Sequence, residues 1–392
     1  MNRRRARKAA GALFGVMAMV CGFHLYAQQT EADVSGAAKG GTFTVFDVPG
    51  AGTGFLEGTF ALGINPAGAI TGYYQDADFG YHGFVRAADG TITTFDAPDD
   101  VGGTFPQGIN PAGTITGYYQ DADFFGHGFL RSPDGVITTF DPPGSIFTSA
   151  ISINPAGAIT GNYEDEKTVI HGFLRAPDGT FTTFDAPGAG TGFLQGTYAS
   201  GINPWGEISG CYIDARAVGH HAFIRARDGA LTTFDVPNST NLYCGLPPQV
   251  GASLGFAINP AGAITGNYFE PIQGNPYGSD YRGFLRTPKG DFKTFDAATY
   301  PPCCIFTYGS AINPAGVIAG FYIDGFGVNH GYVRGTDGTI TTLDAPDAGT
   351  SPVEGEATGT VASAINPAGR VAGSYADQNV SYHGFLWVPR AR

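Results

Sequence analysis

A histidine at a fixed distance from two carboxylates is the arrangement in this chain most able to do chemistry. In its first copy, His82 stands six residues after Asp76 and 14 residues before Asp96. A histidine held between two carboxylates could bind a divalent metal or act as a general base. It could equally join two strand ends through charge-assisted hydrogen bonds. The motif alone leaves both hypotheses open.

The motif recurs through the chain, and its recurrence favours the structural hypothesis. The members of the copies are Asp76, His82 and Asp96; Asp121, His127 and Asp141; Asp165, His171 and Asp185; Asp214, His221 and Asp235; Glu270, Arg282 and Asp296; Asp324, His330 and Asp344; and Asp377, His383 and Asp47. Arginine bridges carboxylates but does not ligate metals, and a catalytic centre is not normally copied into every repeat. We therefore predict structural clamps and assign neither a catalytic residue nor a metal site.

The repeat that carries these residues is marked by the motif Ile-Asn-Pro-x-Gly. Copies begin at Ile64, Ile109, Ile153, Ile202, Ile258, Ile312 and Ile365. Six copies read INPAG, and the fourth has Trp205 in the variable place. A recurring unit of this length is typical of one supersecondary module stacked many times.

Each unit contains the signals of four short antiparallel strands. In the first unit, the turn at residues 64–68 separates a strand around 60–64 from an alternating strand at 70–76. A third strand covers 82–86, and the Asp89-Gly90 turn leads to a fourth at 91–96. The strand order places the histidine and both carboxylates at one rim, together with the connections between units.

The two ends of the repeat region complement each other. Residues 42–47 form a fourth-strand pattern with no unit before it, and residues 383–387 form a third-strand pattern with no fourth strand after it. Joining them would close a ring and leave only short, protected strand edges. The sequence thus predicts an all-β fold: a seven-bladed β-propeller of four-stranded antiparallel blades, closed by the N-terminal strand joining the last blade.

The N-terminus has the pattern of a secretory signal. Basic residues 3–8 precede an apolar stretch at 9–26 and a small residue, Ala27. We expect a signal peptide at 1–27, a flexible lead at 28–41 and the propeller at 42–392; a retained membrane anchor is the alternative. The expected location is secreted, periplasmic or cell-surface, with no integral membrane domain after signal removal.

Charge narrows the choice of partners. The formal net charge is −13, and removal of five basic residues with the signal would make it −18. This balance argues against nucleic acid and anionic membranes as partners.

Cysteines and acidic loops raise two further questions. An exported chain can form disulfides, and Cys244, Cys303 and Cys304 lie in neighbouring connections, so they are disulfide candidates; free thiols are the alternative. The Asp76-Ala77-Asp78 and Asp121-Ala122-Asp123 segments resemble parts of calcium loops, but full calcium-loop spacing is absent. Calcium stays an alternative to solvated loop carboxylates, and no other cofactor is expected.

The longest insertions fall in the fourth to sixth units and are predicted to share the clamp rim. They carry aromatic residues that would serve as binding candidates, because long loops on rigid scaffolds often bind partners and aromatic rims suit sugars or protein surfaces. These residues are Tyr243, Tyr277, Tyr300, Phe306 and Tyr308. A self-packed loop cluster without a ligand is the alternative.

The unit INPAG–GxYxD–HGF–DGTxTTFD resembles the extracellular HAF-repeat proteins of bacteria. The namesake triplet occurs as His221-Ala222-Phe223, and most other copies read HGF. The resemblance covers about residues 42–387 and implies an exported, propeller-like repeat protein. It carries over no catalytic residues.

These observations lead to one functional prediction and two alternatives. We expect an exported repeat protein that acts as an extracellular or cell-surface binding module for a polysaccharide or protein, rather than as an enzyme. The first alternative is a propeller-fold lyase or hydrolase acting on an extracellular polymer. The second is a purely structural envelope protein.

Overall fold

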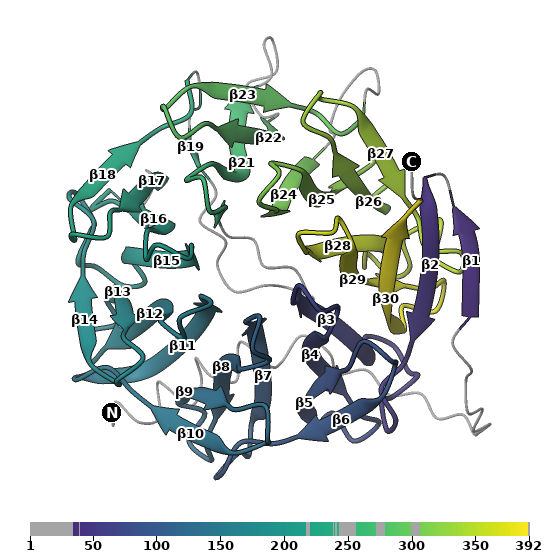
Figure 1. Cartoon of the computed structure of the whole chain (residues 1–392), viewed down its shortest axis with the longest axis horizontal. Coiled ribbons are helices and arrows are strands. Elements are labelled where there is room, and N and C mark those ends of the chain that lie inside the picture. The colour runs from purple at the N-terminus through teal and green to yellow at the C-terminus, as the bar shows by residue number, and fades with distance from the viewer. Residues whose placement is uncertain are drawn as a thin grey trace.

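The chain folds entirely into β-strands wherever the structure describes it. The computed structural model describes residues 34–38, 40–216, 220–237, 239, 241–242, 256–271, 279–298 and 306–390. These ranges contain strands and no helix, so the predicted all-β class is confirmed. The strands lie in groups around a common centre (Figure 1). No helix in the described ranges is long and apolar enough to cross a membrane. The expected signal peptide, residues 1–27, lies outside them.

Consecutive strands pair antiparallel in groups of four. Group 1 contains β3 (Gly58–Ile64), β4 (Ile70–Gln75), β5 (Tyr81–Arg86) and β6 (Ile92–Phe95). Group 2 contains β7 (Gly103–Ile109), β8 (Ile115–Gln120), β9 (Gly126–Arg131) and β10 (Ile137–Phe140). Group 3 contains β11 (Ser145–Ile153), β12 (Ile159–Asp165), β13 (Ile170–Arg175) and β14 (Phe181–Phe184). Group 4 contains β15 (Gly196–Ile202), β16 (Ile208–Ile213), β17 (His220–Arg225) and β18 (Leu231–Phe234).

The later groups follow the same order with two changes. Group 5 contains β20 (Ala257–Ile258), β21 (Ile264–Pro271), β22 (Ser279–Arg286) and β23 (Phe292–Phe295), and β19 (Asn241–Leu242) also pairs with β21. Group 6 contains β24 (Phe306–Ile312), β25 (Ile318–Ile323), β26 (Asn329–Arg334) and β27 (Ile340–Leu343). Group 7 contains β28 (Gly359–Ile365), β29 (Val371–Ala376), β30 (Tyr382–Pro389) and, from the other end of the chain, β2 (Gly41–Phe46).

The segment expected as a flexible lead, residues 28–41, differs from that expectation. Residues Val34–Ala38 form β1, which pairs antiparallel with β2. The outer edge of a sheet exposes unpaired N–H and C=O groups, and β1 occupies that edge on β2.

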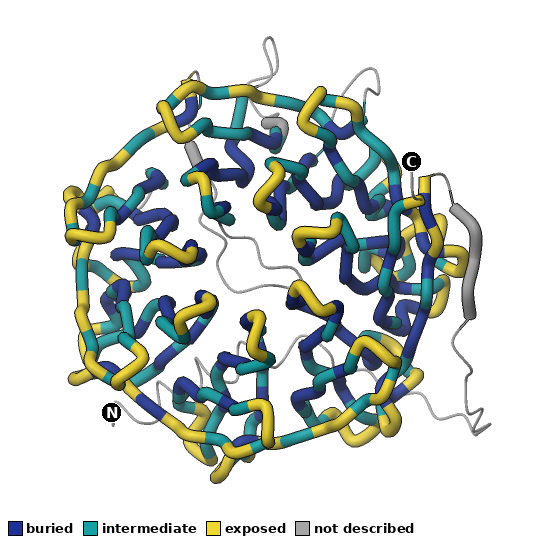
Figure 2. The backbone as a smooth tube through the Cα atoms, viewed as in Figure 1, coloured by how far each residue is buried: buried dark blue, intermediate teal, exposed yellow. Residues whose placement is uncertain are grey.

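The two ends of the strands form two distinct faces. We call the end with the Ile-Asn-Pro turns and the Asp-Gly turns the turn face, and the end with the histidines and the connections between groups the clamp face. In group 1, β3 runs to the turn at Asn65, β4 returns to Asp76, and β5 runs back to the turn at Gly90. Every connection between groups therefore lies on the clamp face. Buried residues fill the groups, and exposed residues follow the turns (Figure 2).

The asparagines of the Ile-Asn-Pro turns form a continuous ring of hydrogen bonds. Each side-chain Nδ2 donates to the backbone carbonyl of the next asparagine, at 3.2 to 3.5 Å. The last, Asn366, donates to Asn65 at 3.2 Å and completes the ring. The same side chain also closes its own turn: Oδ1 of Asn110 accepts the amides of Ala112 and Thr114, both at 3.0 Å. Asparagine is needed here because it both donates and accepts.

Neighbouring groups meet through an arginine and a phenylalanine. An arginine near the end of each third strand lies over the phenylalanine ring of the preceding group's fourth strand, 4.6 to 5.1 Å from the ring centroid. The pairs are Arg86–Phe46, Arg131–Phe95, Arg175–Phe140, Arg225–Phe184, Arg286–Phe234 and Arg334–Phe295. Between groups 6 and 7 both partners change together: Trp387 and Leu343 take these places and share one core cluster.

Glycine in the second strand permits close backbone contact. A Cβ on Gly72 would lie 1.9 Å from the carbonyl oxygen of Phe60, where β3 carries an irregularity in register. Gly161 would meet the carbonyl oxygen of Ser149 at 2.0 Å. The neighbouring third strand contributes the deepest core side chain of each group, such as Phe84 and Phe129, both fully buried.

Candidate functional site: the clamp face

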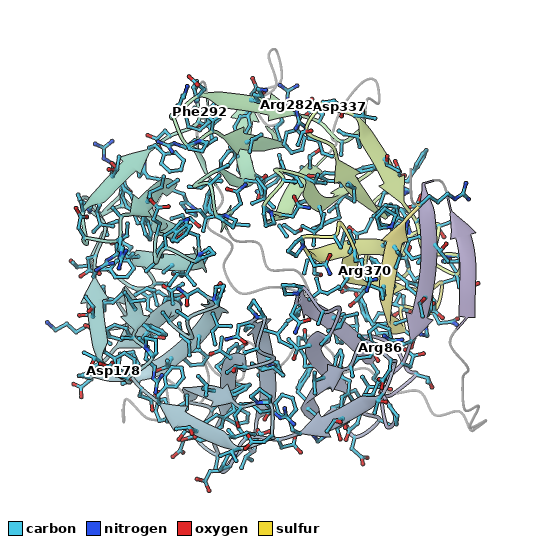
Figure 3. All side chains as sticks on the ribbon, viewed as in Figure 1. Arg86, Asp178, Arg282, Phe292, Asp337 and Arg370 are labelled. Atoms are coloured by element: carbon cyan, nitrogen blue, oxygen red, sulfur yellow. The ribbon has the colours of Figure 1, made fainter. Side chains whose placement is uncertain are left out.

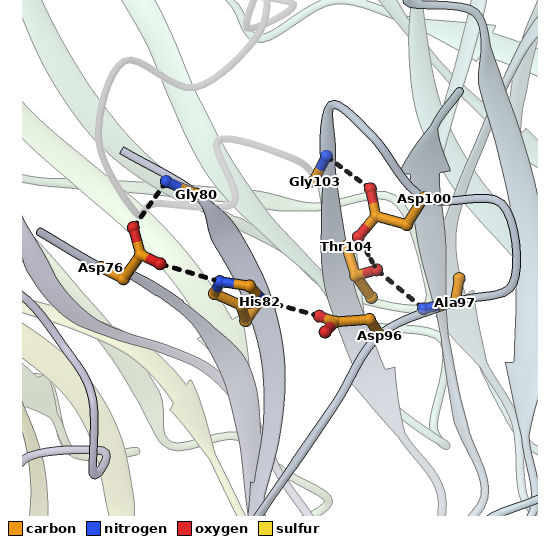
Figure 4. A network of polar contacts seen from close by, with 8 residues as sticks. All are labelled: Asp76, Gly80, His82, Asp96, Ala97, Asp100, Gly103 and Thr104. Carbon is orange, nitrogen blue, oxygen red and sulfur yellow. Dashed lines mark hydrogen bonds and ion pairs between the residues drawn. The ribbon is translucent and has the colours of Figure 1, made fainter. Parts of the chain in front are cut away.

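The clamp of group 1 has the geometry that the sequence predicts. His82 Nδ1 lies 2.9 Å from Asp96 Oδ1, and His82 Nε2 lies 3.2 Å from Asp76 Oδ2 (Figure 4). The histidine comes from β5, while Asp76 follows β4 and Asp96 follows β6, so the contact ties three strand ends together. The imidazole also packs on Tyr74, with ring centroids 5.0 Å apart.

The other groups repeat this contact. Histidine Nδ1 lies 2.8 to 3.1 Å from the carboxylate that follows the fourth strand. The Nε2 contacts are longer and more variable, at 3.4 to 3.9 Å in groups 2, 3, 4, 6 and 7. In group 5, Arg282 lies 2.5 Å from Glu270 and 3.2 Å from Asp296, so arginine replaces histidine as predicted (Figure 3).

The pKa shifts fit a charged clamp. Burial acts to lower the pKa of His82, but the hydrogen bonds that it donates to Asp96 and Asp76 raise it above its ordinary value of 6.5. The hydrogen bond that His330 donates to Asp344 likewise raises the pKa of His330. Burial acts to raise the pKa of Asp76, but the Gly80 amide and His82 hold it below 3.8. An imidazolium between two carboxylates satisfies all three groups.

The first carboxylate of each clamp also organises its own turn. Asp76 Oδ1 accepts the amides of Asp78 and Gly80, at 2.9 and 2.7 Å, while Oδ2 faces His82. Asp121 accepts the amides of Asp123 and Phe125 in the same way, both at 2.9 Å. These acids therefore already have partners on both oxygens. Within the described residues, no group of three or more His, Cys, Asp and Glu side chains is arranged to hold a metal; the calcium alternative is untested.

A further hydrogen bond joins five of the clamps to the next group. The amide of Ala97, which follows Asp96, donates to Oγ1 of the fully buried Thr104 at 2.9 Å. Thr104 in turn donates to Asp100 at 2.7 Å (Figure 4). The clamp of group 1 is thus linked through Ala97 to the first strand of group 2.

Group 3 adapts this link to a proline. Pro142 has no N–H to donate, and Thr148 Oγ1 instead donates to Asp141 at 2.6 Å. A cleft of 240 Å³ opens beside this altered link, lined by Phe125, Gly126, His127, Asp141, Ser145 and Ile146. It brings one clamp histidine and its carboxylate to a concave surface.

The aromatic binding candidates fall into two sets. Tyr243, Tyr277 and Tyr300 lie outside the described residues. Phe306 and Tyr308 lie in β24 and are partly buried: Tyr308 stacks on Phe321 with centroids 4.6 Å apart, and Phe306 meets Tyr281 at 5.2 Å. These two side chains pack within and beside group 6.

The candidate disulfide cysteines Cys244, Cys303 and Cys304 also lie outside the described residues. Cys211, in β16, is disulfide-bonded. It is the sole cysteine of the described ranges. Cys211 was not among the disulfide candidates predicted from the sequence.

Sequence reasoning missed a set of exposed apolar side chains on the clamp face. Of the eight exposed large hydrophobic residues in the described ranges, six lie on this face. They are Phe55, Phe79, Val101, Phe124, Phe193 and Phe326. Phe55 and Phe193 belong to connections between groups, while Phe79, Phe124 and Phe326 belong to the turns after second strands. The sequence signal was available, since phenylalanine stands at turn tips where polar residues and glycine are usual.

Two of these phenylalanines occupy left-handed backbone positions. Phe79 and Phe124 have φ of 66° and 61°, and their side chains are 62% and 54% exposed. In group 6 the same turn position holds Gly327, with φ of 86°. Glycine adopts this conformation without steric penalty, whereas phenylalanine does so at a cost in energy.

Comparisons with known proteins find solved structures of distant similarity. No protein-family model matches the chain, and no curated protein matches it. Similar solved structures include a streptogramin B lyase, with 14% identity over 88% of this chain and 98% of the other, at a TM-score of 0.49. AofleA from Arthrobotrys oligospora has 15% identity over 77% and 89%, at 0.44, and a putative TolB from Agrobacterium tumefaciens has 12% over 61% and 82%, at 0.43. The similar structures are β-propeller proteins.

Proposed function

We propose that the seven groups are blades of a closed seven-bladed β-propeller. The asparagine ring supports this, because its last bond returns from Asn366 to Asn65. The contact between groups 7 and 1 repeats those between other groups: Gly58 pairs parallel with Tyr382, as Gly196 pairs with Ile170. The fourth strand of the last blade is β2, joined to β30.

We infer that this propeller is an exported binding module and that the clamp face binds its partner. The observation that carries the proposal is the gathering of six exposed apolar side chains on one face of a rigid ring. Exposed aromatic residues on one face typically mark a recognition surface. The partner would be an extracellular polysaccharide or a protein surface. The disulfide at Cys211 supports an oxidising compartment outside the cytoplasm.

The left-handed phenylalanines strengthen the proposal. A residue that keeps an unfavourable backbone conformation while exposing its side chain stabilises nothing in the core. Gly327 indicates that glycine fits the same turn without this penalty. A ligand contact made by the ring supplies a reason for phenylalanine at this place.

The cleft beside His127 is the specific observation that favours a lyase or hydrolase as second candidate. Such an enzyme would need one ring nitrogen of His127 to contact the substrate instead of a carboxylate. Both ring nitrogens lie near carboxylates, at 2.8 Å from Asp141 and 3.4 Å from Asp121. The clamp is therefore better suited to holding strands than to moving a proton, and we place binding first.

The experiment compares the wild-type mature protein with a Phe79→Gly/Phe124→Gly double variant. Both would be screened against insoluble and soluble polysaccharides and against the surface proteins of a bacterial envelope, with product analysis for cleavage. We expect an at least tenfold loss of binding in the variant, because buried aromatic contacts commonly contribute more than about 1.4 kcal/mol each. Unfolding curves should change little.

The matched control is Val136→Ser, which alters a similarly exposed side chain on the turn face. Binding should be unchanged in this control. Equal binding by wild type and the double variant would overturn the clamp-face assignment. Polymer cleavage that is lost in His127→Gln would overturn the binding module and favour the enzyme.

A further inference from the structure

The motif Ile-Asn-Pro-Ala-Gly on the turn face is changed in one group, group 4. The residue that follows the motif varies between groups, and in group 4 it is a carboxylate. Here the motif reads Ile-Asn-Pro-Trp-Gly-Glu, with Trp205 and Glu207 where group 1 has Ala67 and Ala69. Both changes occur in a single turn. They alter neither the asparagine ring nor the turn: Asn203 Oδ1 still accepts the amides of Trp205 and Glu207 at 3.0 Å.

Trp205 is held in place while its ring stays in solvent. Its indole Nε1 donates to the carbonyl oxygen of Pro260 in the next group, at 2.8 Å. The side chain is nevertheless 62% exposed, whereas the second tryptophan, Trp387, is 4% exposed and belongs to the core. A hydrogen bond at the edge of the ring fixes its orientation and leaves an aromatic face for a ligand, which lowers the entropy lost on binding.

Glu207 places a carboxylate over the same neighbouring turn. Its Oε2 accepts Nδ2 of Asn203 at 2.6 Å, and this oxygen lies 3.6 Å from the Cβ position of Gly262. Trp205 reaches the same turn through Pro260. The two side chains that break the repeat therefore converge on residues 259–262 of group 5. The carboxylate is positioned by one oxygen, and Oε1 has no hydrogen bond to another described side chain.

We propose that Trp205 and Glu207 form a saccharide-binding subsite on the turn face. A sugar ring presents an apolar face of C–H groups to an aromatic ring and hydroxyl groups to its sides. Trp205 would stack on the apolar face, and Glu207 would accept a charge-assisted hydrogen bond from a hydroxyl. An organic cation is the competing ligand, but such cations are typically enclosed by several aromatic rings, whereas Trp205 is exposed and stacks on no other ring of the described residues. The subsite is independent of the clamp face.

The variants that test this subsite restore the sequence of other groups. Trp205→Ala recreates INPAG, and Glu207→Ala recreates the residue of groups 1, 3 and 5. Both substitutions are therefore compatible with the turn. Val136→Thr, at another exposed position of the turn face, is the control.

The measurement is quenching of tryptophan fluorescence by acrylamide in the full chain, with neutral oligosaccharides built from glucose, N-acetylglucosamine, mannose and xylose as probes. The chain has two tryptophans, and the exposed one should dominate the quenching. We expect at least one oligosaccharide to protect Trp205 saturably with Kd below about 10 mM, and we expect this protection to be unchanged in 1 M NaCl. The turn-face component of calorimetric binding is the one that saturates together with the protection of Trp205. This component should disappear in Trp205→Ala, weaken at least about tenfold in Glu207→Ala and remain in Val136→Thr.

Two results would overturn the proposal. One is the absence of protection by every oligosaccharide in the panel below about 10 mM. The other is protection by choline that is abolished in 1 M NaCl, with no effect of sugars, which would identify a cation site. Because the clamp face is unaltered in these variants, failure here leaves the clamp-face proposal standing.

Discussion

The turn face and the clamp face are built by the same repeats, but they differ in how closely the copies agree. On the turn face, the asparagines make the same ring of bonds in every group, and group 4 alone adds Trp205 and Glu207. On the clamp face, the clamp contacts recur, but six exposed apolar side chains stand in connections and turns that vary between groups. Features that repeat around the ring hold the fold, and features that break the repeat are the places to look for function.

The largest effect should come from breaking the asparagine ring. Asn154→Ala removes the bond to Asn203 and leaves the amides of Ala156 and Ala158 without their acceptor. Each buried polar group left unpaired costs about 1 kcal/mol, so the free energy of unfolding should fall by about 2–3 kcal/mol. Urea unfolding followed by circular dichroism measures this change.

Asn154→Asp separates the ring bond from the turn bonds. Aspartate still accepts both amides but cannot donate to Asn203, so a fall of about 1–2 kcal/mol is expected. If the aspartate variant is as stable as wild type, the ring bond contributes nothing and only the local turn matters.

The second prediction concerns the interface that departs from the arginine–phenylalanine pattern. Trp387→Arg places a cation over Leu343, which offers no aromatic face, and Leu343→Phe places a ring beside Trp387 in a packed core. Each single variant should lower the free energy of unfolding by about 1–3 kcal/mol. The double variant recreates the contact of the other interfaces and should recover about 1 kcal/mol of that loss.

A double-mutant cycle in urea measures this coupling. If the losses in free energy of unfolding of the two single variants simply add in the double variant, positions 387 and 343 are not energetically coupled. Arg131→Met, at an ordinary interface, gives the reference value for losing the cation over Phe95.

Repetition explains how much of this structure the sequence could predict. The Ile-Asn-Pro spacing and the alternating strands gave the groups and their order, and the spacing of His82, Asp76 and Asp96 gave the clamp. Arg282 was correctly expected to bridge Glu270 and Asp296. Each of these relations lies within one unit, where strand register converts sequence distance into spatial distance.

Side-chain contacts between units were out of reach. The bond from Asn65 to Asn110, and the contact of Arg86 with Phe46, depend on how groups pack, and no local pattern encodes that packing. The exposed phenylalanines were missed for another reason: the sequence analysis considered the acidic residues of these turns and not the apolar ones. Only burial distinguishes Phe79, which is exposed, from Val380, which fills the core at the same turn position.

The clamps should make stability depend on pH, with a smaller effect than the ring. The pKa values of His82 and His330 are raised above 6.5, so their contribution is complete below that pH and disappears as the pH rises through the folded-state values. The pKa values of Asp76 and Asp324 lie below 3.8, so their contribution is present above that pH and disappears on acidification. The melting temperature should be highest between about pH 4 and pH 6.5.

The control follows from group 5, where Arg282 stays charged at every pH in this range. His82→Arg should reduce the decline in melting temperature above pH 6.5. His82→Gln should lower the free energy of unfolding below pH 6.5 by less than about 1 kcal/mol, because the clamp is partly exposed. A melting temperature that rises from pH 6 to pH 8 would contradict the charged clamp.

The smallest effect should come from the exposed phenylalanines, and it separates the two kinds of feature most directly. Phe79→Gly removes an exposed ring and a left-handed phenylalanine, while glycine adds flexibility to the unfolded chain, so the free energy of unfolding should change by less than about 0.5 kcal/mol. Val380→Gly changes the same turn position in group 7, where the side chain is fully buried, and should cost about 2–3 kcal/mol. Thermal and urea unfolding of both variants measure the contrast. A large fall in the free energy of unfolding of Phe79→Gly would mean that the exposed ring stabilises the fold. The exposed phenylalanines would then no longer support a binding function for the clamp face.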